Sequence, residues 1–177
     1  MYSGGANVDN PHGFRPLRCL GGGEFRIEAM PLAAANQIIG KYDLVDFTNA
    51  GVVDAASAAS ALIAGVAMEA KAASSGGTIL VLTNPDVICE AQCDDGATVL
   101  IEQTAMYLNA DFIDTAAGAD GMSNQEIDES SGANTSTLPL KVIRLFPDFN
   151  NEFGEFNRLE VMINNHAFGG GLGAAGV

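Results

Sequence analysis

Basic residues are scarce in this sequence. Its 177 residues include eight Lys and Arg against 22 Asp and Glu, which gives a formal net charge of −14 at pH 7. The imbalance is uneven, because residues 1–27 carry one more basic than acidic side chain, while the rest of the chain carries an excess of 15 acidic ones. So acidic a chain repels nucleic-acid phosphates, and no basic patch with interleaved aromatic residues offsets the repulsion. We therefore expect no nucleic-acid partner.

Cysteine and histidine are also rare. Three cysteines, Cys19, Cys89 and Cys93, cannot all pair within one chain and are too few for a disulfide-stapled scaffold, so a reducing compartment is expected. A zinc site would need further Cys or His ligands, and the two histidines, His12 and His166, lie near opposite ends of the chain. We predict that Cys89 and Cys93 are small core residues and that no metal is bound.

Long apolar runs are missing too. No stretch approaches the roughly 18 consecutive apolar residues that a membrane-spanning helix needs, and no basic segment followed by an apolar one marks a signal peptide. Apolar residues nevertheless make up 47% of the chain, and 177 residues are enough to enclose a hydrophobic core. We expect a soluble, non-exported protein with one folded body and no membrane partner.

The familiar catalytic motifs GxSxG, P-loop and HExxH do not occur. Residues 171–176 match the letters of the dinucleotide motif GxGxxG, but that motif requires a following helix whose N-terminus faces the pyrophosphate, and only Val177 follows here. We predict neither enzymatic activity nor a bound cofactor. The enzymatic alternative is a site assembled from scattered residues such as Asp43, Asp46 and His166, whose spacing does not require them to meet.

What the sequence does contain is a series of short strand-like runs separated by turn residues. This pattern predicts an all-β fold, either a small β-barrel or a β-sandwich, with long loops. A turn signal at 83–86 predicts that the runs on either side of it form a hairpin. The strands are expected at 38–48 with a break at Gly40, and at 78–82, 87–93, 98–103, 138–146 and 159–165.

Strict alternation in two of these runs predicts which side chains face the core. Along 87–93 it places two cysteines on the core face and Glu90 on the other. Along 159–165 it places Glu160 opposite the apolar residues. Both glutamates are thus expected on the outer face.

Two regions are harder to interpret. The alanines of 54–71 favour a helix by local propensity, but Gly65 and the compact apolar run around it favour a strand at 62–70, which we prefer. Residues 115–137 are rich in small and polar side chains, so we predict a long surface loop there with one short strand at 125–127.

The most informative segment is N-terminal. Its prolines disfavour a helix and stiffen an extended chain, and it has too few apolar groups to form a core of its own. We predict an extended arm at 1–27 that binds a partner, a β body at 28–168 and a flexible glycine-rich tail at 169–177; a disordered N-terminus is the alternative. The residues expected to contact the partner are Pro11, His12, Phe14, Arg15, Pro16 and Arg18.

Four stretches together resemble a known group of proteins. They are NVDNPHGFRPLRCLGG, LTNPDVICEAQ, MYLNADF and LPLKVIRLFPDFNNEFGEFNRLEVMINNH, and the likeness runs over residues 6–168. In these stretches the chain resembles the head decoration, or capsid cement, proteins of tailed bacteriophages. The alanine-rich residues 55–61 and the glycine-rich residues 169–176 depart from that pattern.

The resemblance implies a β body on the outer surface of a virion capsid, made in the host cytoplasm and commonly trimeric, which ties neighbouring major capsid protein subunits together. It implies no active site. We expect the arm and exposed strand edges to add onto capsid subunits through main-chain hydrogen bonds. The alternatives are another virion component, such as a tail or head-fibre protein, and a β-barrel that binds a small ligand in its interior.

Overall fold

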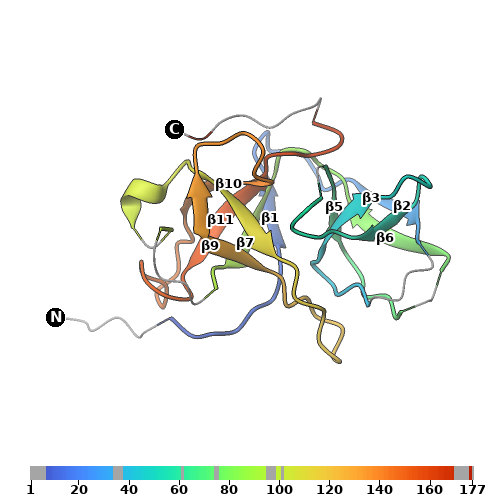
Figure 1. Cartoon of the computed structure of the whole chain (residues 1–177), viewed down its shortest axis with the longest axis horizontal. Helices are drawn as coiled ribbons and strands as arrows, with labels where there is room; N and C mark the ends of the chain where they lie inside the picture. The colour runs from blue at the N-terminus through green and yellow to red at the C-terminus, as the bar shows by residue number, and fades with distance from the viewer. Residues whose placement is uncertain are drawn as a thin grey trace.

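The computed structural model describes residues 7–33, 38–60, 62–73, 76–94, 99–100, 102–169 and 176. In these ranges the chain forms eleven strands and one short 3-10 helix, so the prediction of an all-β fold is confirmed (Figure 1). The elements are β1 (Arg15–Cys19), β2 (Ile27–Pro31), β3 (Leu44–Phe47), β4 (Val53–Ala55), β5 (Ile63–Ala67), β6 (Thr78–Leu82), β7 (Val87–Gln92), the 3-10 helix η1 (Gln103–Ala105), β8 (Asn109–Ile113), β9 (Glu126–Ala133), β10 (Leu140–Leu145) and β11 (Arg158–Ile163).

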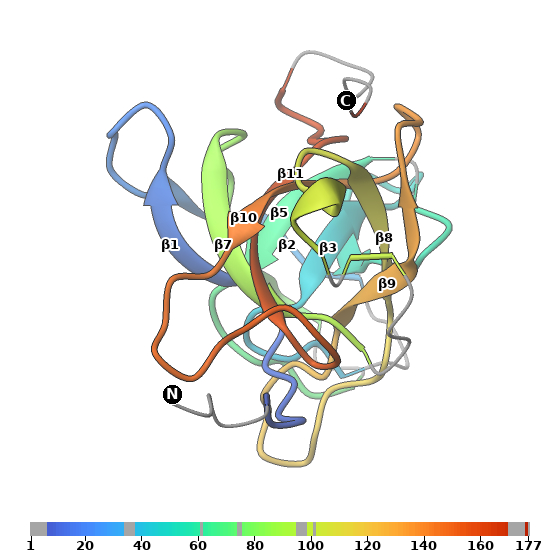
Figure 2. The same ribbon diagram turned by 90° about the vertical axis from the view of Figure 1, so that its left-hand side faces the viewer.

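The strands form two antiparallel sheets that lie side by side along the long axis of the molecule (Figure 1). The six-stranded sheet has the order β1-β7-β11-β10-β8-β9, and the five-stranded sheet has the order β2-β6-β5-β3-β4. Figure 2 looks onto the six-stranded sheet, with β1 at one side of the view and β8 and β9 at the other. The first strand of the chain is therefore an edge strand of the larger sheet.

Both sheets curl back on themselves. In the six-stranded sheet an isolated bridge joins Cys93, just after β7, to Ile127 in β9, and the Asp94 amide donates to the Ile127 carbonyl at 3.1 Å. In the five-stranded sheet a bridge joins Leu32, just after β2, to Val53 in β4. Each of these bridges occupies main-chain groups at a sheet edge that a partner strand could otherwise use.

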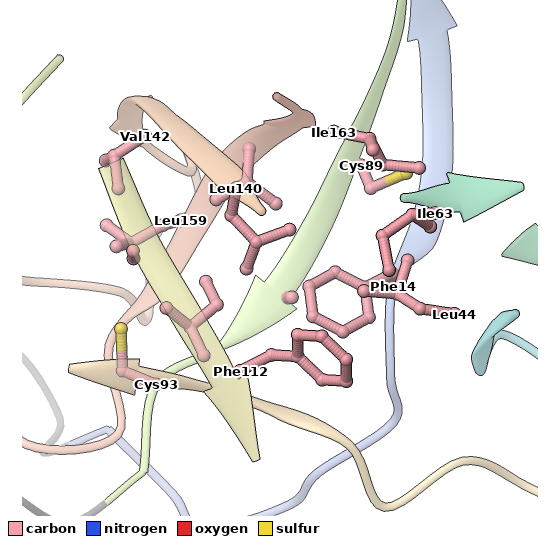
Figure 3. Packing of buried hydrophobic residues seen from close by; sticks show 14 of the residues in the cluster. Phe14, Leu44, Ile63, Cys89, Cys93, Phe112, Leu140, Val142, Leu159 and Ile163 are labelled. Atoms are coloured by element: carbon pink, nitrogen blue, oxygen red, sulfur yellow. The ribbon is translucent and has the colours of Figure 1, made fainter. Parts of the chain in front are cut away.

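The core has a large and a small part. The large cluster draws residues from both sheets, and the rings of Phe14 and Phe112 meet edge to face in it, with centroids 6.1 Å apart (Figure 3). Leu44 and Ile63 of the five-stranded sheet reach into the same cluster. The small cluster belongs to the five-stranded sheet and its connections, and it contains Met30, Leu32, Ile39, Val45, Val53, Ala64, Ala67, Ile79 and Val81.

The strand expected at 62–70 is confirmed as β5, and the helical alternative is wrong. All five residues of β5 are buried. Gly65 has a φ of 152°, and a Cβ at this position would overlap the carbonyl oxygen of Leu82 in the neighbouring strand. Close approach of two backbones thus overrides the helix propensity of the surrounding alanines.

The predicted hairpin between 78–82 and 87–93 is wrong, although strands form at both places. β6 belongs to the five-stranded sheet and β7 to the six-stranded sheet. The turn at 83–86 therefore carries the chain from one sheet to the other. A turn signal fixes where the chain reverses but not which strands pair.

Other boundaries differ as well. The described residues in 98–103 form no strand, and Gln103 begins η1. The run expected at 38–48 becomes a strand only from Leu44. The short strand expected at 125–127 is instead the eight-residue β9. Its polar, small residues gave little apolar alternation to indicate that length.

The arm predicted at 1–27 is not separate from the body. Residues 1–6 lie outside the described ranges, but β1 pairs with β7, and Phe14 just before it is 1% exposed within the large cluster. The edge of the body therefore lies before Phe14, and not at residue 28. Most of the tail at 169–177 also lies outside the described residues.

Candidate functional site

Two glutamates lie side by side on the outer face of the six-stranded sheet. Glu90 of β7 and Glu160 of β11 are directly paired across the strands, and their side chains are 0% and 1% exposed. Two carboxylates buried next to each other repel and lose hydration, so each needs cationic partners. Sequence alternation placed both glutamates on the outer face, but it did not indicate that other side chains would bury them there.

Four arginines supply those partners. Glu90 accepts hydrogen bonds from Arg15 and, at 2.9 Å, from Arg158. Glu160 accepts from Arg18 at 2.5 Å and from Arg144 at 2.9 Å. The sheet order β1-β7-β11-β10 brings these residues together from both ends of the chain. We call this set the arginine face; it consists of Arg15, Arg18, Arg144, Arg158, Glu90, Glu160 and Asp148.

The electrostatics of the arginine face follow from this pairing. Burial alone raises the pKa of Glu160, but the hydrogen bonds from Arg18 and Arg144 outweigh it and hold that pKa below its ordinary value. A hydrogen bond from Arg158 likewise lowers the pKa of Asp148. Glu160 and Asp148 therefore stay ionised at neutral pH. The ion pairs of the arginine face link four neighbouring strands.

A groove of about 860 Å³ opens beside the arginine face. One wall is the segment before β1, which Gln92 holds against the body by accepting from the Asn10 amide at 2.9 Å and donating to the Val8 carbonyl at 3.2 Å. Asn7 extends this anchorage, because its amide group donates to the Glu152 and Glu155 carbonyls at 2.8 Å. The wall is therefore formed by the protein itself before any partner binds.

The groove is lined by both charged and apolar side chains. Its lining holds three cationic residues and two carboxylates, and Arg158 also pairs with Asp148 beside it, so the groove is close to neutral on a strongly acidic chain. Its lining residues are Val8, Asp9, Asn10, His12, Arg15, Lys41, Tyr42, Glu90, Gln92, Met122, Asn150 and Arg158.

The residues predicted to contact a partner take different positions. His12 lines the groove, and the side chains of Arg15 and Arg18 remain 47% and 44% exposed on the arginine face. Pro11 is partly buried in the groove wall segment. Phe14 fills the core, which corrects its expected role as a partner contact.

Pro16 lies in β1 opposite Cys89, next to a register shift at Leu17. A proline lacks the amide donor, and a bulge interrupts the ladder, so an edge strand with both is poorly suited to pairing with another chain. β1 therefore offers little to the expected main-chain attachment. The side chains of its arginines remain available.

The residues of the enzymatic alternative take separate partners. Asp43 accepts from the Gly40 amide at 2.6 Å, and burial raises its pKa. Asp46 accepts from the Ser60 hydroxyl. His166 is 2% exposed and accepts from the Phe168 amide at 3.1 Å, and burial and then nearby Arg26 lower its pKa to about 4. None of these contacts joins two of the three residues.

All three cysteines are buried and unpaired, which confirms the core positions predicted for Cys89 and Cys93. Burial is the main cause that raises the pKa of each thiol, so none is poised as a nucleophile. Among the residues that the structure describes, no three His, Cys, Asp or Glu side chains are grouped so as to hold a metal ion. In the same part of the chain, no helix is long and apolar enough to cross a membrane.

Comparison with known proteins adds no relative. No family model, curated protein or solved structure matches this chain. The features that indicate a function are therefore the arginine face, the groove and the sequence resemblance.

Sequence reasoning missed Lys41, Arg144 and Arg158 as members of one site. The available signal was weak: two outward glutamates on strands with alternating patterns, in a chain with few arginines. Which arginines would reach them depends on the strand order, and that order is set by contacts between distant residues.

Proposed function

We propose that this protein is a structural component of a tailed-phage virion. It binds the outer surface of the capsid and cements neighbouring major capsid protein subunits, and it does so as a homo-oligomer, most simply a trimer. It is made in the host cytoplasm and joins the virion there. The sequence resemblance over residues 6–168 supports the proposed family, and the arginine face supports a role in binding other proteins.

The observation that carries the proposal is the arginine face. Its two buried glutamates each accept hydrogen bonds from two arginines, so their charges are used to join strands. A rigid block with half-exposed guanidinium groups on one face suits a protein that adheres to other proteins, because arginine is enriched at such interfaces.

The mode of attachment that we propose differs from a free strap. β1 belongs to the body, both sheets use strand edges for their own closure, and Pro16 weakens the remaining edge. Attachment through side chains of a preformed surface fits these features better than strand addition. Several such surfaces on one oligomer would give avidity beyond that of a single contact.

The alternative of a ligand inside a barrel has less support. The large groove lies outside both curled sheets, whereas the enclosed space between strands is filled by the two clusters of buried side chains. A tail or head-fibre protein would use the same surface chemistry. The place where the protein binds on the virion therefore distinguishes this alternative from a capsid cement protein.

The test mixes the purified full-length protein with expanded, empty capsids that lack it and examines them by electron microscopy. We expect added density at repeated positions on the outer surface, together with a trimeric mass in sedimentation. Capsids already carrying the protein serve as the control, since they should gain no density. Bare shells at saturating protein would overturn the proposal, and density only at the tail vertex would favour the fibre alternative.

A further inference from the structure

The groove beside the arginine face contains a cation without an anionic partner. The Lys41 ammonium group lies 4.9 Å from the centre of the Tyr42 ring, and within the described ranges no carboxylate is within ion-pair distance of it. Other lysines and arginines with described ion pairs, such as Lys71 with Glu69 at 3.1 Å, have their charge compensated. Lys41 is therefore available to an incoming anion.

The glutamate at the floor of the groove does not compete for that anion's place. Glu90 is fully buried and already accepts from Arg15 and Arg158. The His12 ring lies at the same point, with its Nε2 3.8 Å from Glu90 Oε1. Because His12 Nδ1 donates to the Asn10 carbonyl at 3.1 Å, Nε2 is an acceptor in the neutral ring and offers no donor to an anion. A carboxylate entering here would meet the donors of Lys41 and the outer edge of Arg15.

The rim of the groove is apolar. Val8 is 74% exposed on one wall, and Phe149, next to the lining residue Asn150, is 82% exposed. Tyr42 and Met122 line the inside. Aromatic residues, methionine and arginine are the side chains enriched where proteins bind one another.

We propose that this groove binds a short acidic segment of a protein partner, one or two carboxylates flanked by apolar side chains. That this partner is the capsid rests on the function proposed above. The volume of about 860 Å³ falls in the range of roughly 300–1,000 Å³ that encloses a drug-sized ligand, which corresponds to a few residues of peptide.

Charge distinguishes this occupant from nucleic acid. A single carboxylate can pair with Lys41 while the rest of its segment is apolar and indifferent to the acidic body. A polyphosphate chain would extend beyond the groove over a protein of net charge −14. Repulsion of the remaining phosphates then outweighs the gain at one site.

The first experiment measures the affinity of full-length protein for empty capsids by co-sedimentation. Lys41→Met should raise Kd at least tenfold, and Val8→Asp, which adds a negative charge at the rim, should do the same. Lys71→Met is the matched control, because it removes the same charge away from the groove; its Kd should stay within twofold of the unsubstituted protein. Equal binding by all variants would overturn the inference and leave the proposed function standing.

The second experiment does not depend on the capsid. The peptide acetyl-Asp-Leu-Asp-Phe-amide is titrated into isotope-labelled protein, and amide shifts are followed by NMR. We expect saturable shifts at His12, Lys41 and Tyr42, lost in Lys41→Met and absent with the Asn counterpart of the peptide. No shift, shifts confined to other surfaces, or tighter binding of a single-stranded oligonucleotide at the groove would overturn the inference. Groove binding of the peptide by a protein that leaves capsids bare would support it and overturn the proposed function alone.

Discussion

Phe14 packs against a residue nearly 100 positions later in the chain. Its ring meets Phe112 edge to face, and the side chain is 1% exposed (Figure 3). Removing a buried Phe costs about 3–5 kcal/mol, because apolar contacts are lost and a cavity remains. We therefore expect Phe14→Ala to lower the free energy of unfolding by about that amount, as measured by urea denaturation.

The matched control for this prediction is Val8→Ala. Val8 lies six residues before Phe14 in the same segment but is 74% exposed. Its truncation should change stability by no more than about 0.5 kcal/mol. Similar small effects for both substitutions would mean that the segment does not pack on the body in solution.

His166 makes stability depend on pH. Its pKa is lowered to about 4 by burial and by Arg26, from an ordinary value of 6.5. Between these values the unfolded chain binds a proton that the folded protein does not, so stability falls as pH falls from about 6.5 towards 4. The full effect is about 3 kcal/mol for a shift of this size. It is absent above pH 6.5.

We expect His166→Asn to remove this dependence. The Asn side-chain oxygen can replace Nδ1 as acceptor for the Phe168 amide, and it does not titrate. Unfolding free energies of both proteins between pH 7.5 and 4 should show the variant gaining on the original by about 3 kcal/mol towards low pH. Comparing the two proteins cancels other titrating groups, such as Asp43, whose pKa burial raises. A constant difference across this range would contradict the assignment.

We expect β1 to be essential for the stability of the fold, although its own sequence has no clear strand pattern. It pairs with β7, its arginines neutralise Glu90 and Glu160, and it is preceded by Phe14. A chain beginning at Gly21 loses all three contributions and leaves two buried carboxylates short of a partner. We expect its melting temperature to fall by more than about 10 °C, since each kcal/mol is worth roughly 2–4 °C in a domain of this size.

The full-length chain is the reference for that truncation, and both melting temperatures are measured by circular dichroism. If the chain beginning at Gly21 kept the stability of the full protein, β1 would be dispensable and the packing described here would be incorrect. The expected loss also means that failure of a truncated protein to bind capsids would not locate the binding surface. Point substitutions in the groove are needed for that purpose.

Local sequence patterns predicted those strands whose own residues show a clear apolar run or alternation. β6, β7, β10 and β11 follow from apolar runs and alternation, and the preference for β5 over a helix follows from its glycine. The partners of these strands do not follow, because pairing is decided by residues far apart in the chain. The hairpin between β6 and β7 failed for this reason.

The same limit applies to the site. Alternation placed Glu90 and Glu160 on the outer face, but their burial depends on arginines from β1, β10 and β11. Composition indicated that the N-terminal segment had too little apolar surface to fold alone. That argument was sound, but it assumed that the missing contacts come from another molecule, whereas for Phe14 they come from the chain itself.

On the scale of the whole molecule, the basic residues are concentrated on one face, whereas the hydrophobic core is shared by both sheets. The acidic surplus is spread over a chain of net charge −14, whereas four of its eight basic residues gather on the arginine face. The hydrophobic core, in contrast, is shared: Leu44, Ile63 and Leu82 of the five-stranded sheet lie in the cluster that fills the six-stranded one. The two sheets should therefore depend on each other for stability.

This sharing predicts a single unfolding transition. Neither sheet can separate without exposing the common cluster, so calorimetry should give a van't Hoff enthalpy equal to the measured one. The decisive variant is Ile79→Ala, which opens a cavity in the small cluster of the five-stranded sheet alone. At about 2–5 kcal/mol, it should move the whole transition down by roughly 5–15 °C and keep it single. A second, earlier transition in this variant would show that the five-stranded sheet unfolds by itself, because only an independent unit can be destabilised separately from the rest.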